Sequence, residues 1–244
     1  MLIDVSFLAQ KLQIRPVGVL HVGAHKAEEL DQYKKHEWSL RSKTIWVEAQ
    51  PNLARELNDR IDPAHNIVIN AVAWSEDNKE ISFHLTSNGE SSSVYELAEH
   101  LNKHPKIKEV GKLQLRTSKL SSVLPLEAKF DFINLDIQGA ELQALKGLEQ
   151  YISGVKWIYT EVNKISLYKN IPLIKEIDRH LAAEGFTRYM TRWVPFKGWG
   201  DALYISDDEL KRNKYPGRLI IYTYKTRMTV SFSIMRLKNF LKSF

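Results

Sequence analysis

The chain has 244 residues, of which 43% are hydrophobic, and it can therefore bury one substantial core. It contains no cysteine, which excludes structural disulfides and thiolate metal sites and fits a reducing compartment. No run reaches the ~18 apolar residues of a membrane span, and the N-terminus lacks the pattern of a cleaved signal peptide. We expect a cytoplasmic protein built as a single α/β domain with additions.

The net charge of +6 is unevenly distributed along the chain. Residues 211–244 hold nine basic residues and no acidic ones, which leaves 26 basic and 29 acidic residues in 1–210. We therefore divide the chain into a weakly acidic domain, 1–210, and a basic C-terminal extension, 211–244.

The extension is predicted to form a strand over 219–224, followed by an amphipathic helix. Apolar residues recur in it at roughly helical spacing, with basic residues between them: Phe232, Met235, Leu237, Phe240, Leu241 and Phe244. Such a helix packs on the domain or on a second subunit of a homodimer. The alternative is peripheral contact with anionic lipid at the inner membrane surface.

Strands and helices alternate over the first part of the chain. The predicted elements are a helix over 4–13, a strand over 17–22, a helix over 27–36, a strand over 44–48, a helix over 53–61 entered at Pro51, and a strand over 66–73. An inserted region follows, about 84–125. It contains the end of a short strand over 81–85, the polar loop TSNGESSS, a helix near 94–102 and a strand near 112–117.

Regular alternation then returns. The pattern predicts a strand over 130–136, a helix over 140–148, a strand over 157–162, a helix over 172–184, and a hairpin of strands over 186–193 and 202–205. Strands that alternate with crossover helices predict a mainly parallel, right-handed sheet. In such sheets ligands bind where the carboxyl ends of the strands meet.

The first candidate site residues follow strand 17–22. Gly23 allows the backbone to approach a ligand closely, and the N-terminus of the next helix favours negative charge. The spacing is not G-x-G-x-x-G, so the dinucleotide fingerprint is absent. Glu48, at the tip of the second strand, is placed to accept hydrogen bonds from a ribose diol. The alternatives are a purely structural glycine turn and a solvated acid that caps the helix after Pro51.

Further acidic residues follow two later strands, in the sequence FDFINLDIQGAE and at Glu161. Asp136 and Glu161 would lie side by side, where they could bind a divalent cation (Mg²⁺ or Mn²⁺), orient a ligand or act as a base. Glu141 and Asn163 are candidates for substrate contact, although Glu141 could instead favour the helix dipole.

The remaining candidates for substrate contact are weaker. A hydroxyl-rich substrate loop could be formed by Ser91, Ser92 and Ser93, with a flexible turn as the alternative. Asp201 and the aromatic Trp199 could form a wall against a sugar, or belong to a hairpin turn. No nucleophile elbow and no Walker loop is present.

The segments VGAHKAEEL, WVEAQP, NAVAW, NGESSSV, FINLDIQGAELQALKG, YTEVN and GWGDALYI, in that order, resemble the FkbM family of S-adenosylmethionine-dependent methyltransferases. The resemblance covers roughly Val17 to Ile205. It implies the class I methyltransferase fold, which is Rossmann-like, with a seven-stranded sheet and an antiparallel last strand. It also implies methyl transfer to an oxygen, commonly a sugar hydroxyl in a glycan, a lipopolysaccharide or a glycosylated metabolite.

The resemblance carries roles over to named positions. The S-adenosylmethionine would contact, in chain order, His21, Gly23, Ala24, His25, Glu48, Ala49, Asn70, Ala71, Val72 and Asp136. The catalytic candidates are Asp136, Glu161 and His25. The sequence departs from the family at Ala27, where glycine is usual, at Gln50, where asparagine is common, and at Glu90, where glutamine is expected. The last departure puts any substrate contact from that loop in doubt.

The prediction is a methyltransferase that acts on a sugar hydroxyl. Two alternatives remain open at this point, a binding module that keeps the fold without turnover and a nucleic-acid methyltransferase. The basic tail motivates the second alternative. The acidic body and the absence of interleaved aromatic and basic residues argue against it, and no nucleic-acid partner is expected.

Overall fold

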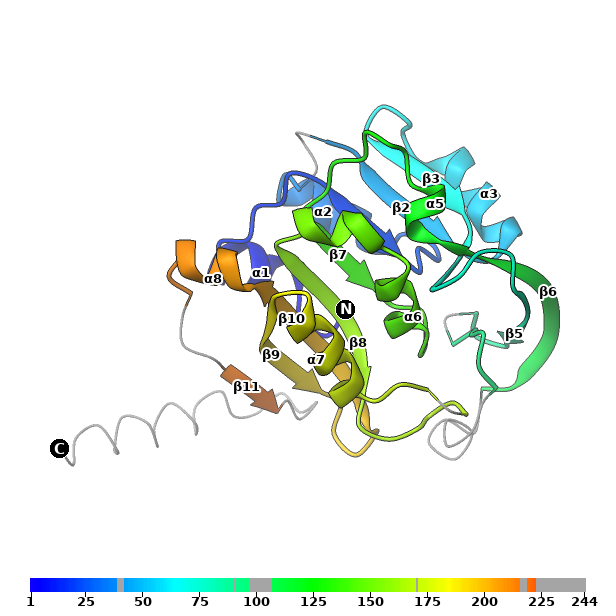
Figure 1. Cartoon of the computed structure of the whole chain (residues 1–244). Coiled ribbons are helices and arrows are strands. Elements are labelled where there is room, and N and C mark those ends of the chain that lie inside the picture. Colours follow the sequence, from blue (N-terminus) through cyan, green and yellow to red (C-terminus); the bar gives the residue numbers. More distant parts are fainter. Residues whose placement is uncertain (39–41, 90, 97–106, 170, 216–218, 223–244) are drawn as a thin grey trace.

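The structure is a computed structural model (Figure 1) that describes residues 1–244 apart from 39–41, 90, 97–106, 170, 216–218 and 223–244. Its centre is an eight-stranded sheet in the order β11-β9-β10-β8-β7-β1-β2-β3. The strands of this sheet are β1 (Val19–Val22), β2 (Thr44–Glu48), β3 (Asn66–Asn70), β7 (Phe132–Leu135), β8 (Trp157–Asn163), β9 (Phe186–Trp193), β10 (Trp199–Ser206) and β11 (Leu219–Tyr222).

The sheet order confirms the predicted fold class. Strands β3, β2, β1, β7 and β8 are parallel neighbours, whereas β10 runs antiparallel to both β8 and β9. This seven-strand arrangement is the class I methyltransferase fold. Strand β11 adds an eighth strand at the edge, parallel to β9. It lies within the strand predicted over 219–224, whose last two residues are outside the described residues.

Helices flank the sheet. They are α1 (Val5–Lys11), α2 (Leu30–Lys35), α3 (Pro51–Arg60), α5 (Leu120–Val123), α6 (Glu141–Lys146), α7 (Ile174–Ala183), α8 (Asp207–Arg212) and the 3₁₀ helix η1 (Glu149–Gly154). Helix α8 crosses residue 210, so secondary structure continues across the expected domain boundary. The amphipathic helix of the extension falls in residues 223–244, outside the described residues, and its lipid or dimer contacts remain predictions.

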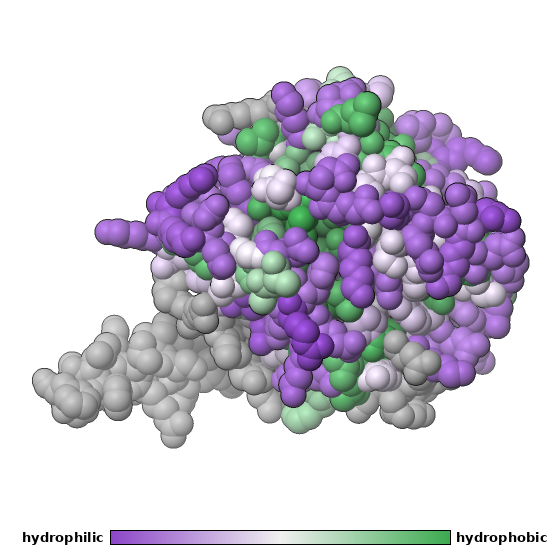
Figure 2. Space-filling model, viewed as in Figure 1, coloured by the Kyte–Doolittle hydropathy of each residue, from purple (hydrophilic) through white to green (hydrophobic). Residues whose placement is uncertain are grey.

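Side chains that alternate along each strand supply two core layers. Leu20, Val22 and Ile133 belong to a cluster that also contains apolar residues of α6 and α7. Val19 and Phe132 belong to a second cluster, with residues of α1, α2 and α3. Burial of each large apolar side chain contributes about 1.5–3 kcal/mol, so the two layers hold the sheet rigid beneath the strand tips. The visible face in Figure 2 is mostly polar.

The predicted strand over 66–73 is wrong as a single element. It breaks at Ala71 into β3 and β4 (Val72–Trp74), and β4 leaves the main sheet to pair with β6 (Glu109–Lys119). Strand β5 (Glu80–Thr86) pairs with the other edge of β6 and completes a small three-stranded sheet. The inserted region therefore contributes two extended strands that lie beside the main sheet.

The helix predicted near 94–102 is not present at its start, because residues 94–96 are irregular, and 97–102 lie outside the described residues. Within the described ranges, no helix combines the length and apolar character needed to cross a bilayer.

Candidate active site

Two adjoining cavities lie at the carboxyl ends of the parallel strands. The larger has a volume of about 500 Å³ and the smaller about 70 Å³. Both are lined by Gly23, His25, Asp136 and Gln138. These four residues therefore form the junction at which a ligand in one cavity would meet a ligand in the other.

Gly23 joins the tips of β1 and β7. Its φ is +91°, and a Cβ on this residue would lie 1.9 Å from the carbonyl oxygen of Asp136. The amide of Gly23 donates to the carbonyl of Val47 on β2 (2.9 Å), and so does that of Ala24 (3.0 Å). Only glycine fits this close approach. Ala24 itself is buried beneath the turn and lines neither cavity.

Glu48 is a buried carboxylate at the tip of β2 that lines the smaller cavity. Its Oε2 accepts from the backbone amide of His25 (2.8 Å), and its Oε1 accepts from that of Gln50 (2.8 Å). Burial raises the pKa of Glu48, and the two amides oppose that shift. Because each carboxylate oxygen can accept more than one hydrogen bond, both oxygens keep capacity for two adjacent hydroxyls.

The remaining wall of the smaller cavity is largely apolar. Ala49, Ala71, Val72 and Phe83 line it, as suits a flat aromatic base. Asn70 lies outside it. The Asn70 amide instead donates to the carbonyls of Glu48 (2.8 Å) and Ala49 (3.1 Å), so it fixes the β2 tip rather than contacting the cavity.

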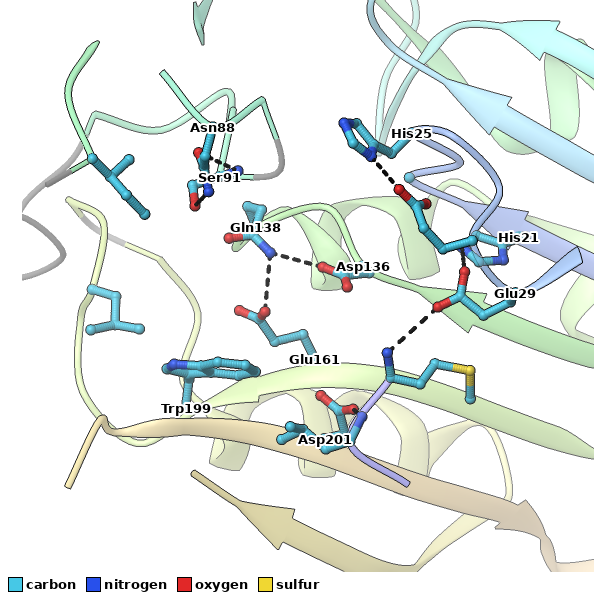
Figure 3. A pocket seen from close by; sticks show the side chains of 16 residues that line it. His21, His25, Glu29, Asn88, Ser91, Asp136, Gln138, Glu161, Trp199 and Asp201 are labelled. Carbon is cyan, nitrogen blue, oxygen red and sulfur yellow. Dashed lines mark hydrogen bonds and ion pairs between the residues drawn. The ribbon is translucent and has the colours of Figure 1, made fainter. Parts of the chain in front are cut away.

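Gln138 connects two of the predicted catalytic carboxylates. Its amide nitrogen donates to Asp136 Oδ1 (2.8 Å) and Glu161 Oε2 (3.1 Å), and its Oε1 accepts from the hydroxyl of Tyr168 (2.8 Å). Figure 3 shows the side chains of Gln138, Asp136 and Glu161 converging at the cavity. Gln138 has a φ of +54°, a conformation that L residues rarely adopt. The sequence cluster around Asp136 contained Gln138, but no role was predicted for it.

Glu161 and Asp201 both line the larger cavity. Burial raises the pKa of Glu161 well above its ordinary value, and repulsion from Asp136 adds to the shift. Burial raises the pKa of Asp201 to about 6, opposed by hydrogen bonds from the Tyr159 hydroxyl and the Leu2 amide. With a pKa of about 6, Asp201 is mostly ionised at neutral pH.

His21 and His25 both line the larger cavity, and His21 is the more deeply buried of the two. His21 is buried and stacks on Trp46, with ring centroids 4.8 Å apart, and burial lowers its pKa. His25 Nδ1 lies 2.8 Å from Glu28 Oε1. His25 also supplies the backbone amide that holds Glu48, and the residue lines both cavities.

Some predicted substrate residues lie away from both cavities. Glu141 is buried, and its carboxylate accepts from the backbone amides of Ile137 (3.1 Å) and Gly139 (3.0 Å), which closes the turn before α6. Burial raises the pKa of Glu141 to about 7. Asn163 is also buried, and Ser93 donates to the carbonyl of Gln138 (2.8 Å).

The other predicted substrate residues do reach a cavity. Ser92 lines the smaller one, and Trp199 lines the larger one together with Asp201. Residues without a predicted role also line the larger cavity: Met1, Leu2, Glu28, Glu29, Asn88, Ser91, Ile107, Gln138 and Leu167. Among these, Ser91 belongs to the predicted hydroxyl-rich loop, whereas no sequence motif marks Met1 or Leu2 as part of a site.

The predicted metal site gains no support from the side chains present. Across the described part of the chain, no group of three or more histidine or acidic side chains is placed to hold a metal ion. Asp136 and Glu161 are joined through the amide of Gln138. We therefore assign no metal role to these carboxylates.

The sheet order and the strand-tip cavities define a methyltransferase-type α/β protein. The family model described as "Methyltransferase FkbM domain" matches residues 21–188, more than half of the chain. The protein belongs to this FkbM methyltransferase family, as the resemblance of its motifs indicated.

A curated relative is the 2-O-methyltransferase NoeI of Sinorhizobium fredii (strain NBRC 101917 / NGR234), 29% identical over 150 residues. The match covers 57% of this chain and 61% of NoeI, so this chain spans less than two thirds of that relative. Two solved structures are similar to this chain. The methyltransferase FkbM from Methylobacillus flagellatus KT has a TM-score of 0.45 and 14% identity, with 77% of this chain and 43% of that chain covered. A SAM-dependent methyltransferase from Aquifex aeolicus has a TM-score of 0.40 and 15% identity, with 78% and 81% covered.

Proposed function

We propose that this protein is an S-adenosylmethionine-dependent O-methyltransferase that methylates a sugar hydroxyl in a glycan, a lipopolysaccharide or a glycosylated metabolite. Family membership supports methyl transfer, and the name of the NoeI relative supports an oxygen acceptor. The observation that carries the proposal is the junction of two cavities at Gly23, His25, Asp136 and Gln138.

The smaller cavity fits the nucleoside part of the cofactor. Its apolar wall suits adenine, and Glu48 offers an acceptor on each oxygen for the two ribose hydroxyls. Gly23 brings the backbone of β1 to the junction without a side chain in the way. When bound there, S-adenosylmethionine supplies an electrophilic methyl group on sulfur.

Asp136 is the residue best placed to activate the acceptor. It is exposed at the junction and lines both cavities. A carboxylate there can accept the proton of a hydroxyl that approaches from the larger cavity, which typically accelerates such reactions ~10²–10⁴-fold. Gln138 fixes the orientation of Asp136, and alignment of the reacting atoms can lower the barrier by ~7–11 kcal/mol.

Glu161 and His25 have supporting roles in this proposal. Glu161 lines the larger cavity and accepts the Gln138 amide, so it is placed to hold a hydroxyl group of the acceptor. His25 pairs with Glu28, and Figure 3 shows His25 across the cavity from Glu161.

The larger cavity suits a polyhydroxylated ring. Trp199 offers an aromatic face, while Asn88 and Ser91 offer hydrogen-bonding groups on the facing loop. A nucleic-acid acceptor gains no support, because phosphates would meet a wall that contains five carboxylates.

The test is incubation with methyl-labelled S-adenosylmethionine and a panel of free and lipid-linked glycans. We expect label in a base-stable methyl ether of one class of sugar, and we expect Asp136→Asn to reduce the label at least tenfold. Binding of the cofactor without transfer to any glycan of the panel would argue for the non-catalytic alternative.

A further inference from the structure

The larger cavity is strongly acidic. Five carboxylates line it, namely Glu28, Glu29, Asp136, Glu161 and Asp201, and none of the described residues that line it is lysine or arginine. One of its two histidines, His21, is kept neutral by burial, which lowers its pKa. The N-terminal ammonium of Met1 also lines the cavity and lies 3.5 Å from Glu29 Oε1, so it offsets part of this negative charge. The acidic groups still outnumber it, and the described wall favours a cation over an anion.

Binding of the methyl donor does not account for the acidic groups of the larger cavity. Asp136 lies at the junction and serves both cavities, whereas the other four carboxylates line only the larger one. These four carboxylates therefore surround the candidate acceptor site and lie away from the nucleoside site.

Of the five carboxylates, Asp201 gives the strongest indication that this wall binds a ligand. The residue is only 5% exposed, yet it lines the cavity. Its Oδ2 accepts from the Leu2 amide (2.5 Å) and from the Tyr159 hydroxyl, whereas its Oδ1 has no partner among the described residues. This oxygen is therefore available to accept a hydrogen bond from a ligand that enters the cavity.

Trp199 and Glu161 surround Asp201. Trp199 lies two residues before Asp201 on β10 and so shares its face of the sheet, and Glu161 is directly opposite on β8. An aromatic face beside carboxylates is the pattern that receives an ammonium group attached to a ring. The raised pKa of Asp201, to about 6, reflects burial and the neighbouring charge of Asp136. The N-terminal ammonium already opposes this shift, and the charge of a cation bound in the cavity would oppose it further.

We propose that the acceptor is an amino sugar with a free, protonated amine, and that the wall formed by Asp201, Glu161 and Glu29 rejects sugars that carry carboxylate or phosphate. The proposal rests on the proposed function, because it names the acceptor of that reaction. Charge selection is a property of binding, however, and it can be measured without turnover.

The experiment compares three β-1,4-linked glucose-based oligosaccharides of equal length. One carries a free amine at C2, one a hydroxyl at C2, and one a carboxylate at C6. Calorimetry measures their binding to the full chain in the presence of S-adenosylhomocysteine, at low and at moderate salt. We expect the amine to bind at least about tenfold more tightly than the hydroxyl, with a preference that salt weakens, and the carboxylate to bind most weakly.

Two variants test which residues produce the preference for the amine. Asp201→Asn keeps the shape of the side chain, and we expect it to reduce the preference for the amine about tenfold. Glu29→Gln, on a less buried residue of the same wall, is expected to reduce it as well. Asp59→Asn makes the same change of charge on the exposed surface of α3 and should leave the preference unchanged.

The outcomes separate the two proposals. Equal binding of the amine and the carboxylate, an unchanged preference in both wall variants, or no binding of the amine overturns charge selection, even if label is transferred to other sugars. The expected order of affinities without any methyl transfer supports charge selection and overturns the proposed reaction.

Discussion

Asp201 on β10 lies directly opposite Glu161 on β8, so two buried carboxyl groups share one face of the sheet at the candidate acceptor cavity. The pKa of each is raised, mainly by burial. A sheet seldom places two acids in register in its interior, because removing each carboxylate from water costs free energy. This arrangement therefore indicates a functional role rather than a contribution to stability.

The raised pKa of Asp201 predicts that the protein loses stability as the pH rises through 6. The folded protein binds the proton of this carboxyl more tightly than the unfolded chain, so its contribution is fully present below pH 4 and is lost as the pH rises through about 6. The shift from 3.8 to about 6 corresponds to about 3 kcal/mol.

The measurement is denaturant unfolding between pH 4 and 7 for the wild type and for Asp201→Asn. The variant should show a shallower decline of stability over this range. Identical slopes for the two proteins would show that Asp201 does not titrate with a raised pKa.

Gly23→Ala should disrupt the junction. The added Cβ would overlap the Asp136 carbonyl, and the φ of +91° is strained for alanine. We expect a loss of about 2 kcal/mol or more in unfolding free energy and at least tenfold weaker cofactor binding. The control is Gly154→Ala, where no atom lies within 4 Å of the added Cβ and no positive φ is required. Equal unfolding free energy and equal cofactor affinity of the two variants would contradict the close approach of β1 and β7.

Glu48→Gln should weaken binding of S-adenosylmethionine. Glutamine keeps the size of the side chain but replaces one acceptor oxygen with a donor, so one backbone amide and one ribose hydroxyl lose their partner. We expect a Kd at least tenfold higher by calorimetry. Glu56→Gln, exposed on α3, serves as the control. Unchanged affinity in Glu48→Gln would remove this residue from the cofactor site.

Gln138→Ala should reduce kcat more than it affects cofactor affinity. The variant loses the amide that holds both Asp136 and Glu161, so the base is no longer oriented. We expect a decrease of ~10–100-fold in kcat and a changed pH profile, because the two carboxyls are then free to move. Gln150→Ala on the exposed η1 should retain full activity. A loss of folding stability with unchanged kcat and pH profile would indicate a purely structural role.

Much of the fold was predictable because apolar runs that end in acids mark buried parallel strands. Glu48 and Asp136 follow from that pattern, and both line the cavities. Local patterning could not show the break at Ala71, because the departure of β4 depends on its partner β6, about 45 residues further along the chain.

Other features depend on contacts that a local pattern does not contain. The amide of Leu2 reaches Asp201 across 199 residues of sequence, so no motif could place the N-terminal segment in the cavity wall. Glu141 looked like a ligand-facing acid, but its carboxylate turns inward to cap amides of its own turn. The role of Gln138 arises from its positive φ, which residue type alone does not reveal.

A crystal structure of the protein with S-adenosylhomocysteine would test the central claim most directly, because that claim is geometric. We expect the ribose hydroxyls on Glu48, the adenine against Val72 and Phe83, and the sulfur at the junction beside Asp136, facing the larger cavity. A nucleoside bound elsewhere, or a sulfur that faces away from Asp136, would contradict the account.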